Sequence, residues 1–272
     1  MTLYHILSEK AHRTPQKVAI IQGQRRITYE ELNTGTGFLA SFLVEQGIHP
    51  GDRVAIFSDN CPEYVMSYLG VQKAGAIAVD INPQYAACEV KRLLHHSLSS
   101  MLIVGSKFYK TALESVQEAP YVKSVIVMND RENHLLPADL GRQNTTAHVS
   151  IYHFEDIVKK QNGCRAVPPA RSTDIASIVY TSGTTGVPKG VMLSHENFMS
   201  NAESIVEYLR LTDKDIAMVV LPFQYSYGKS ILNTHIMAGG TMVLEDNFVY
   251  PNVILHRIVE EEVTGFAGVP ST

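Results

Sequence analysis

The sequence predicts an α/β protein in which two mostly parallel sheets and their helices form a layered αβαβα arrangement. Short runs rich in Val and Ile alternate along the chain with helical patterns of about a dozen residues, as the crossovers between parallel strands require. With 272 residues and 45% hydrophobic composition, the chain is long enough to bury a large core. Gly, Pro and Asn punctuate the alternation at regular places.

The first half of the chain shows the alternation most clearly. A strand ends at Thr28, and Thr28 with Glu31 has the spacing of a capping box at the start of a helix. The next helix has Asn60 as its expected cap, Pro62 in its first turn and Gly75 after its end. The other elements expected here are strands over residues 53–58, 76–81, 101–105 and 124–129, and a helix over residues 86–98.

The second half repeats the alternation after residues 130–149, which we interpret as an irregular insertion. The expected strands are 175–182, 190–194, 216–223, 240–246 and 264–270, and the expected helices are 195–210, 226–240 and 250–262. The sequence thus predicts a first α/β subdomain over residues 1–163 and an incomplete second one over residues 174–272. A connector with Pro, Gly and Ser, residues 164–173, joins them.

Charge and composition exclude several classes of protein. The net charge of −4 lacks the basic balance of a nucleic-acid-binding protein. No apolar run approaches the ~20 residues of a transmembrane helix, and the N-terminus carries charge too early for a secretory signal. We therefore expect a cytoplasmic protein with no transmembrane segment and no nucleic-acid partner.

Cysteine and histidine give no sign of a metal site. Cys61, Cys88 and Cys164 are odd in number and far apart, which argues against a disulfide framework and against zinc. We expect all three to be reduced, buried thiols. His95 and His96 lack partners at metal-ligand spacing, so we expect them to be solvated histidines of a helix.

The stretch "YTSGTTGVPKG" at residues 180–190 fits neither a core strand nor a helix. Its hydroxyls can donate hydrogen bonds, and its glycines allow the backbone to approach a ligand closely. Successive N–H groups in such a turn form an anion-binding concavity, and Lys189 adds a positive charge. The stretch therefore predicts a site for nucleotide phosphates, although an ordinary hairpin loop is the alternative. The residues expected to bind the nucleotide are Thr181, Ser182, Gly183, Thr184, Thr185, Gly186 and Lys189.

Neither common nucleotide motif accounts for this loop. The nucleoside-triphosphatase motif requires a hydroxyl residue after its lysine and then a helix, but Gly190 and an apolar strand pattern follow Lys189 here. The dinucleotide-binding pattern G-x-G-x-x-G is also absent.

The longer stretch "YTSGTTGVPKGVMLSH" resembles the phosphate loop of the adenylate-forming superfamily, which includes acyl-CoA synthetases, adenylation domains of nonribosomal peptide synthetases, and luciferases. Further stretches are similar to landmarks of this family and follow in family order. They are "ITYEEL" at 27–32, "GDRVAIFSDNCPEY" at 51–64, "VQKAGAIAVDINP" at 71–83, "LPFQYSYG" at 221–228 and "AGGTMVL" at 238–244.

The resemblance implies a reaction and its cofactors. Members of the family activate a carboxylic acid with ATP to give an acyl-adenylate and pyrophosphate, and then pass the acyl group to a thiol. The cofactors implied are ATP, Mg²⁺ and coenzyme A, or phosphopantetheine on an acyl carrier protein. Lys189 would be catalytic, because together with the hydroxyls of the loop it would stabilise the charge that grows on the departing pyrophosphate.

The acid site is implied less directly. Tyr225 stands where many members of the family have a histidine between the acyl pocket and the nucleotide. The resemblance implies that Tyr225 and Gly228 bind the acid substrate, while simple packing of Tyr225 is the alternative. The helix expected over 226–240 would line an acyl tunnel or would be a plain core helix. An amino-acid-anchoring "FDxS"-like segment is not visible, which favours a fatty or aryl acid.

The resemblance covers only the N-terminal portion of the family. The family's adenine loop, metal-holding glutamate, ribose-binding aspartate and C-terminal catalytic lysine have no counterpart in this sequence, so we expect a truncated domain that does not complete the reaction by itself. The sequence leaves open an acyl-CoA ligase, an acyl-AMP ligase or adenylation domain that loads a carrier protein, and a non-catalytic half-domain that binds a nucleotide or a partner.

Overall fold

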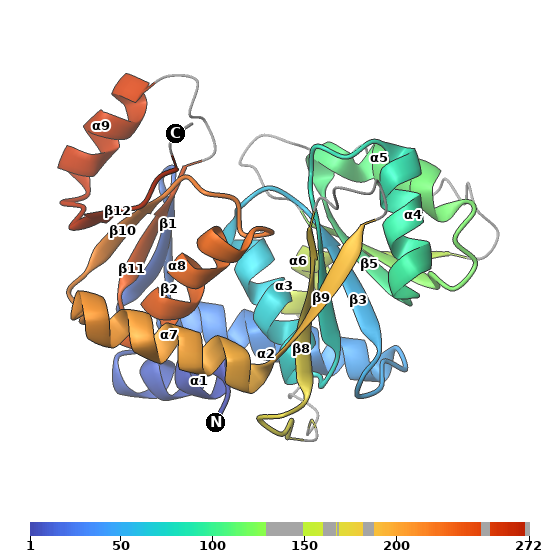
Figure 1. Ribbon diagram of the computed structural model, residues 1–272, viewed down its shortest axis with the longest axis horizontal. Helices are drawn as coiled ribbons and strands as arrows, with labels where there is room; N and C mark the ends of the chain where they lie inside the picture. The colour runs from blue at the N-terminus through green and yellow to red at the C-terminus, as the bar shows by residue number, and fades with distance from the viewer. Residues whose placement is uncertain (129–148, 160–166, 168, 182–187, 246–250, 270–272) are drawn as a thin grey trace.

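The computed structural model describes residues 1–128, 149–159, 167, 169–181, 188–245 and 251–269, and they form two sheets that stand side by side (Figure 1). The smaller sheet has the order β12 (Gly265–Phe266), β10 (Ile216–Val219), β11 (Thr241–Leu244), β1 (Val18–Gln22), β2 (Arg25–Thr28). The larger sheet has the order β7 (Ser150–His153), β6 (Ser124–Met128), β5 (Met101–Gly105), β3 (Arg53–Phe57), β4 (Ile77–Ile81), β8 (Ile175–Thr181), β9 (Lys189–Ser194). Only the β1–β2 and β8–β9 pairs of these sheets are antiparallel.

Helices cover both faces of each sheet, which gives the αβαβα layers that the sequence predicts (Figure 1). The central layer consists of α1 (Leu3–Arg13), α2 (Tyr29–Glu45), α3 (Pro62–Lys73), α6 (Phe154–Lys159), α7 (His195–Leu209) and α8 (Ser226–Ala238). The outer face of the larger sheet is covered by α4 (Ala87–Ser97) and α5 (Tyr109–Val116), which follows the short helix η1 (Ser106–Phe108). The outer face of the smaller sheet is covered by α9 (Pro251–Glu260).

The strand sequences explain how the larger sheet packs against helices on both of its faces. Along β3, Val54 and Ile56 pack into the central core, while Ala55 and Phe57 pack under α4 and α5. Successive side chains of a strand point to opposite faces, and all four are fully buried. A strand that is apolar at every position is therefore expected in a parallel sheet with both faces covered.

Helix starts follow the sequence signals in one case and depart from them in another. Thr28 and Glu31 form the expected capping box at the start of α2. The prediction that Asn60 caps α3 is wrong. The N-cap residue is Cys61, and its Sγ accepts a hydrogen bond from the backbone N–H of Tyr64 at 3.3 Å. The amide of Asn60 instead bonds to a distant segment, which is described below.

The two sheets do not coincide with the expected subdomains 1–163 and 174–272. The hairpin β1–β2 comes from the start of the chain and joins the strands β10–β12, while β8 and β9 join the strands β3–β7. Residues 164–173 thus fall between α6 and β8, and the strands before and after them, β7 and β8, belong to one sheet. The expected insertion at 130–149 lies outside the described residues apart from residue 149.

Several elements were not expected from the sequence, namely α1, β1, α5, α6 and β7. The expectation about the thiols was wrong in one case: Cys61 is buried as expected, but Cys88 is exposed at the start of α4, and Cys164 lies outside the described residues. Among the helices of the described part, none is long and apolar enough to cross a membrane.

Candidate functional site

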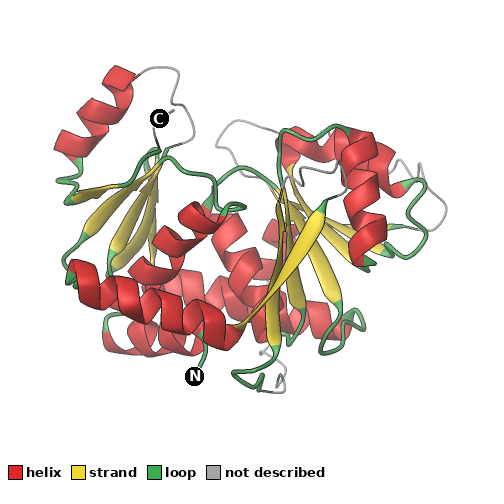
Figure 2. Cartoon of the chain, viewed as in Figure 1, coloured by secondary structure: helices red, strands yellow, loops and turns green. Residues whose placement is uncertain are grey.

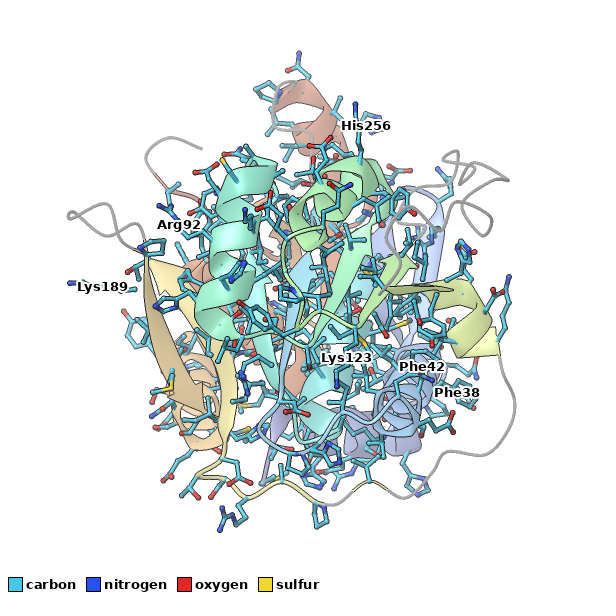
Figure 3. The ribbon with its side chains drawn as sticks, turned by 90° about the vertical axis from the view of Figure 1, so that its right-hand side faces the viewer. Phe38, Phe42, Arg92, Lys123, Lys189 and His256 are labelled. Atoms are coloured by element: carbon cyan, nitrogen blue, oxygen red, sulfur yellow. The ribbon has the colours of Figure 1, made fainter. Side chains whose placement is uncertain are left out.

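The β8–β9 hairpin frames the expected phosphate loop. Thr181, at the end of β8, is the register partner of Lys189, at the start of β9, and both side chains are exposed. Lys189 lies at the edge of the molecule with its side chain directed away from the body of the protein (Figure 3). The hairpin therefore brings a hydroxyl and an ammonium to the two ends of the loop. Ser182, Gly183, Thr184, Thr185 and Gly186 lie outside the described residues.

A cleft of about 170 Å³ lies between the two sheets at the carboxyl ends of their strands. It is lined by residues that follow strands of both sheets: Asp59 and Asn60 after β3, Asn82, Pro83 and Gln84 after β4, Val220 and Pro222 after β10, and Glu245 after β11. Figure 2 shows the loops between the sheets gathered on this side. In open α/β sheets, ligands bind in a crevice of this kind, outside the carboxyl ends of the strands.

Tyr225 lies on the wall of this cleft. It is the N-cap residue of α8, its side chain is half exposed, and its hydroxyl accepts a hydrogen bond of 3.1 Å from the Nδ2 of Asn82. The structure thus brings Tyr225 to a cleft but gives it a protein partner as well. A tyrosine held in this way can still donate its own hydroxyl hydrogen to a ligand.

Gly228 has a structural reason to be glycine. A Cβ at this position would lie 2.2 Å from the backbone oxygen of Pro222 and 2.9 Å from that of Leu221. The first turn of α8 therefore packs directly on the segment that precedes it. This close approach holds Tyr225 and the residues after it against the cleft.

Asn60 supports the same segment, a role that the sequence analysis did not find. Its Nδ2 donates to the carbonyl of Leu221 at 2.9 Å, and its Oδ1 accepts from the N–H of Phe223 at 2.8 Å. All three residues are buried, so these bonds replace water for backbone groups that would otherwise be unsatisfied. Asn60 and Leu221 are more than 150 positions apart in the sequence, so no local pattern could predict the bonds between Asn60 and this segment.

A second cavity, of about 380 Å³, lies on the other side of the α8 N-terminus, between α7, α8 and the β8–β9 hairpin. Ser226 and Tyr227 line it, whereas Tyr225 lines the cleft. Its apolar wall includes Val179 and Leu193 of the hairpin. The volume is within the ≈ 300–1,000 Å³ range of small-molecule sites.

The hairpin links this cavity to the phosphate loop. Val179 and Thr181 are two residues apart on β8, so their side chains point to the same face of the sheet, and only about 7 Å of strand separates them. A ligand in the cavity and an anion at the loop would therefore approach the same face of β8. A reaction between two bound molecules requires that they lie close together, and a shared face of one strand is compatible with that.

A buried ion pair lies behind the cavity. Lys229 of α8 has its Nζ 3.0 Å from Oδ2 of Asp80 on β4, and both side chains are almost completely buried. Tyr64 of α3 accepts a hydrogen bond of 2.6 Å from Lys229 and donates one to Asp80. Ser177 of β8 donates to Asp80 at 3.2 Å.

Burial determines how this cluster titrates. Loss of hydration lowers the pKa of Lys229, and the Asp80 carboxylate opposes that effect. Burial raises the pKa of Tyr64 well above its usual value, and the charge of Asp80 raises it further. Hydrogen bonds from Lys229, Tyr64 and Ser177 to Asp80 offset part of the lost hydration of this buried pair.

The histidines do not form a metal centre. His96 Nδ1 lies 2.8 Å from the hydroxyl of Tyr180, and His95 Nε2 lies 2.7 Å from the carbonyl oxygen of Glu118. Both histidines therefore have protein partners, and His95 is only partly exposed. In the described part of the chain, no group of three or more His, Cys, Asp or Glu side chains has the geometry to hold a metal ion.

The chain matches the AMP-binding enzyme family over residues 7–272. It is 31% identical over 284 residues to a long-chain-fatty-acid–CoA ligase of Bacillus subtilis, covering 99% of this chain and 50% of the relative. It is 30% identical over 272 residues to gramicidin S synthase 2 of Brevibacillus brevis, covering 99% of this chain and 5% of that much longer protein.

A solved structure gives the same result. The O-succinylbenzoate coenzyme A synthetase of Bacillus subtilis, in complex with AMP, superposes with a TM-score of 0.79 at 25% identity, covering 98% of this chain and 61% of that chain. The chain thus spans about half the length of the fatty-acid ligase and a much smaller share of gramicidin S synthase 2. With the family match over nearly the whole chain, these comparisons establish that the protein belongs to the AMP-binding enzyme family.

Proposed function

We propose that this chain supplies the phosphate-binding and acid-binding half of an AMP-forming ligase. In the proposed reaction a carboxylate oxygen of the acid attacks the α-phosphorus of ATP. The bond from that phosphorus to the bridging oxygen breaks, and pyrophosphate leaves with the electron pair. A thiolate, of coenzyme A in the favoured alternative, then attacks the acyl carbon, and AMP leaves.

The observation that supports the proposal is that Thr181, after which the expected phosphate loop begins, and Val179, which lines the 380 Å³ cavity, lie on one face of β8. In the proposed complex, Thr181, Lys189 and the loop residues 182–186 hold the β and γ phosphates. Charge grows there as pyrophosphate departs, and preorganised donors stabilise such charge without reorganising. The side chain of Lys189 is exposed at the start of β9.

The acid would lie in the cavity with its carboxylate toward the N-terminus of α8. The N-terminal end of a helix favours negative charge. Tyr225 lines the cleft on the other side of that end, so its hydroxyl would donate to a carboxylate oxygen that reaches the cleft. Gly228 would act by allowing α8 to approach the preceding segment, which places Tyr225 at the cleft. We retain a fatty or aryl acid as the favoured substrate class.

The Mg²⁺ implied by the family would need ligands from this chain or from the bound nucleotide. In that part of the chain no set of three acidic or histidine ligands is preassembled. Mg²⁺ typically binds through one or two carboxylates together with substrate phosphates.

The acceptor of the acyl group is a separate question. The fatty-acid–CoA ligase relative favours coenzyme A, while the gramicidin S synthase relative favours a phosphopantetheine on a carrier protein. A non-catalytic nucleotide- or partner-binding half-domain is the alternative of another class. The cytoplasmic location stays a prediction.

Acid-dependent exchange of labelled pyrophosphate into ATP tests the proposed reaction. The protein that contains this chain would be assayed with panels of fatty, aryl and amino acids. Exchange stimulated by fatty or aryl acids supports the proposal, and exchange with amino acids alone would overturn the favoured substrate class. Thioester formation with coenzyme A, compared with a phosphopantetheinylated carrier protein, distinguishes the acceptors.

A further inference from the structure

The end of the β8–β9 hairpin lies beyond the part of the hairpin that pairs with the rest of the larger sheet. Within the described sheet, the last residue of β8 with a register partner on β4 is Val179. Tyr180 and Thr181 continue β8 and pair with β9, which is the edge strand. Backbone pairing therefore leaves Thr181 and Lys189, the two described residues of the candidate phosphate site, at the end of a two-stranded ribbon.

The side chain of Tyr180 connects this end of the hairpin to α4. Its hydroxyl oxygen lies 2.8 Å from Nδ1 of His96, and the two rings meet edge to face with their centroids 5.6 Å apart. The Tyr180 ring also covers the backbone of Gly190 on β9, because a Cβ at Gly190 would lie only 3.3 Å from Cε1 of Tyr180. Tyr180 thus packs across both strands at the start of the loop and bonds to a helix outside the hairpin.

The helix that carries His96 is anchored on two sides. Three of its apolar side chains are almost completely buried in the core that covers the outer face of the larger sheet: Val90, Leu93 and Leu94. The neighbouring His95 bonds to the hydroxyl of Tyr121 and lies 2.7 Å from the carbonyl oxygen of Glu118, both in the segment after α5. A hydrogen bond to His96 therefore joins the hairpin end to a part of the protein that is itself well packed.

We propose that His96 and Tyr180 are positioning residues of the phosphate site: their hydrogen bond holds Thr181 and Lys189 in the arrangement that receives the phosphates of ATP. This inference rests on the proposed function, in which Thr181 and Lys189 contact the β and γ phosphates. Groups that are held in place before the ligand arrives lose less freedom on binding, so such preorganisation raises affinity. The pair acts through the hairpin end and needs no contact of its own with the nucleotide.

Calorimetry of ATP binding to this chain tests the proposal with two variants that break the bond. Tyr180→Phe keeps the ring and removes the hydroxyl, and His96→Leu removes the ring nitrogen. Each should weaken ATP binding about threefold to tenfold, which is the range that one hydrogen bond allows. The double variant should lose little more than either single variant, because both changes remove the same bond. The affinity for adenosine, which has no phosphate, should stay unchanged.

A second histidine–tyrosine pair on the same helix supplies the matched control. His95 and Tyr121 also share a hydrogen bond and an edge-to-face contact, with ring centroids 5.1 Å apart, but they tie α4 to the segment after α5. Tyr121→Phe should therefore leave the ATP affinity unchanged, whatever it costs in stability. His96→Asn returns a polar atom close to the place of Nδ1 and should recover most of the affinity that His96→Leu loses. Melting curves show that each variant is folded at the temperature of the titration.

The outcomes separate this inference from the proposed function. If Lys189→Ala weakens ATP binding but Tyr180→Phe does not, the phosphate site stands and the inference is wrong. Additive losses in the double variant, or a loss in Tyr121→Phe as large as that in Tyr180→Phe, would also overturn the inference, because the effect would then not belong to this bond. If ATP binding is indifferent to Lys189→Ala as well, the phosphate site itself fails, and the inference fails with it.

Discussion

The buried pair of Asp80 and Lys229 offers the sharpest test of the packing between the two sheets. We predict that Asp80→Asn destabilises the protein by about 3 kcal/mol, because it leaves a buried ammonium without its counter-ion. Asp80 has no exposed side-chain surface, and it accepts hydrogen bonds from Lys229, Tyr64 and Ser177. The asparagine keeps one oxygen acceptor, so the loss should lie at the low end of the ~3–5 kcal/mol range for a broken buried pair.

Urea unfolding measures the free energies, and a double-mutant cycle isolates the pair. Lys229→Met leaves Asp80 with its two hydroxyl donors and should cost about 2 kcal/mol. The double variant has no unpaired charge, so it should be no less stable than Asp80→Asn alone, with a coupling energy of about 2–3 kcal/mol. Glu118→Gln, in the exposed pair with Lys91, is the control that should change stability little.

The pH dependence of the Asp80→Asn variant provides a second check. The pKa of Lys229 is already lowered in the folded protein by burial, and removal of the carboxylate lowers it further. Above the folded pKa the unfolded state binds more protons, so stability rises with pH by up to about 1.4 kcal/mol per unit. The deficit of the variant should therefore shrink as the pH rises from the lowered pKa of Lys229 toward the ordinary pKa of lysine, ~10.4. Additive single-variant losses, or a deficit that does not depend on pH, would refute the reasoning.

Three further predictions concern the supports of the site. Gly228→Ala should destabilise the protein by about 1–3 kcal/mol, because the added Cβ would clash with the backbone. The control Gly265→Ala, with open space around it, should change the stability little. Equal melting temperatures of the two variants would contradict this. Asn60→Ala should speed amide exchange at Phe223, its bonded neighbour, and an unchanged exchange rate would show that the bond matters little. Burial lowers the pKa of His195 to about 4 from its ordinary 6.5, so stability should fall as pH drops through that window, where the unfolded state takes up the proton first. His195→Gln should remove this part of the slope in urea unfolding at graded pH, and an identical slope would contradict the assignment.

The layers and strand faces could be predicted from the sequence because they depend on local patterns. The apolar run of β3 and the capping box at Thr28 are complete within a few residues. The assignment of strands to sheets could not be predicted in this way. For example, β1 pairs with β11 through Ile20 and Met242, and the sequence around either residue does not indicate which strand it pairs with. The helix α1 starts without a side-chain capping bond and has no acidic residue in its first turn, so the local signals of a helix start are weak there.

The candidate site shows the same division. The hydroxyls and glycines after β8 form a contiguous motif, so the phosphate loop could be found by inspection. The cluster of Asp80, Tyr64 and Lys229 comes from three elements, β4, α3 and α8, so no local pattern in the sequence brings the three residues together. Asn60 had a plausible local role as a helix cap, and tertiary contacts with the segment before α8 took precedence.

The most direct test of the central claim is the binding of ATP, AMP and adenosine to this chain, measured by calorimetry with and without Lys189→Ala. The account places the β and γ phosphates at the loop between Thr181 and Lys189, so ATP should bind more tightly than AMP or adenosine. Lys189 is exposed, so the variant should stay folded and lose about tenfold or more in ATP affinity, as removal of a charged hydrogen bond implies, with adenosine binding unchanged. Equal affinities for ATP and adenosine, or ATP binding that is indifferent to Lys189→Ala, would contradict the claim that this hairpin is a phosphate site.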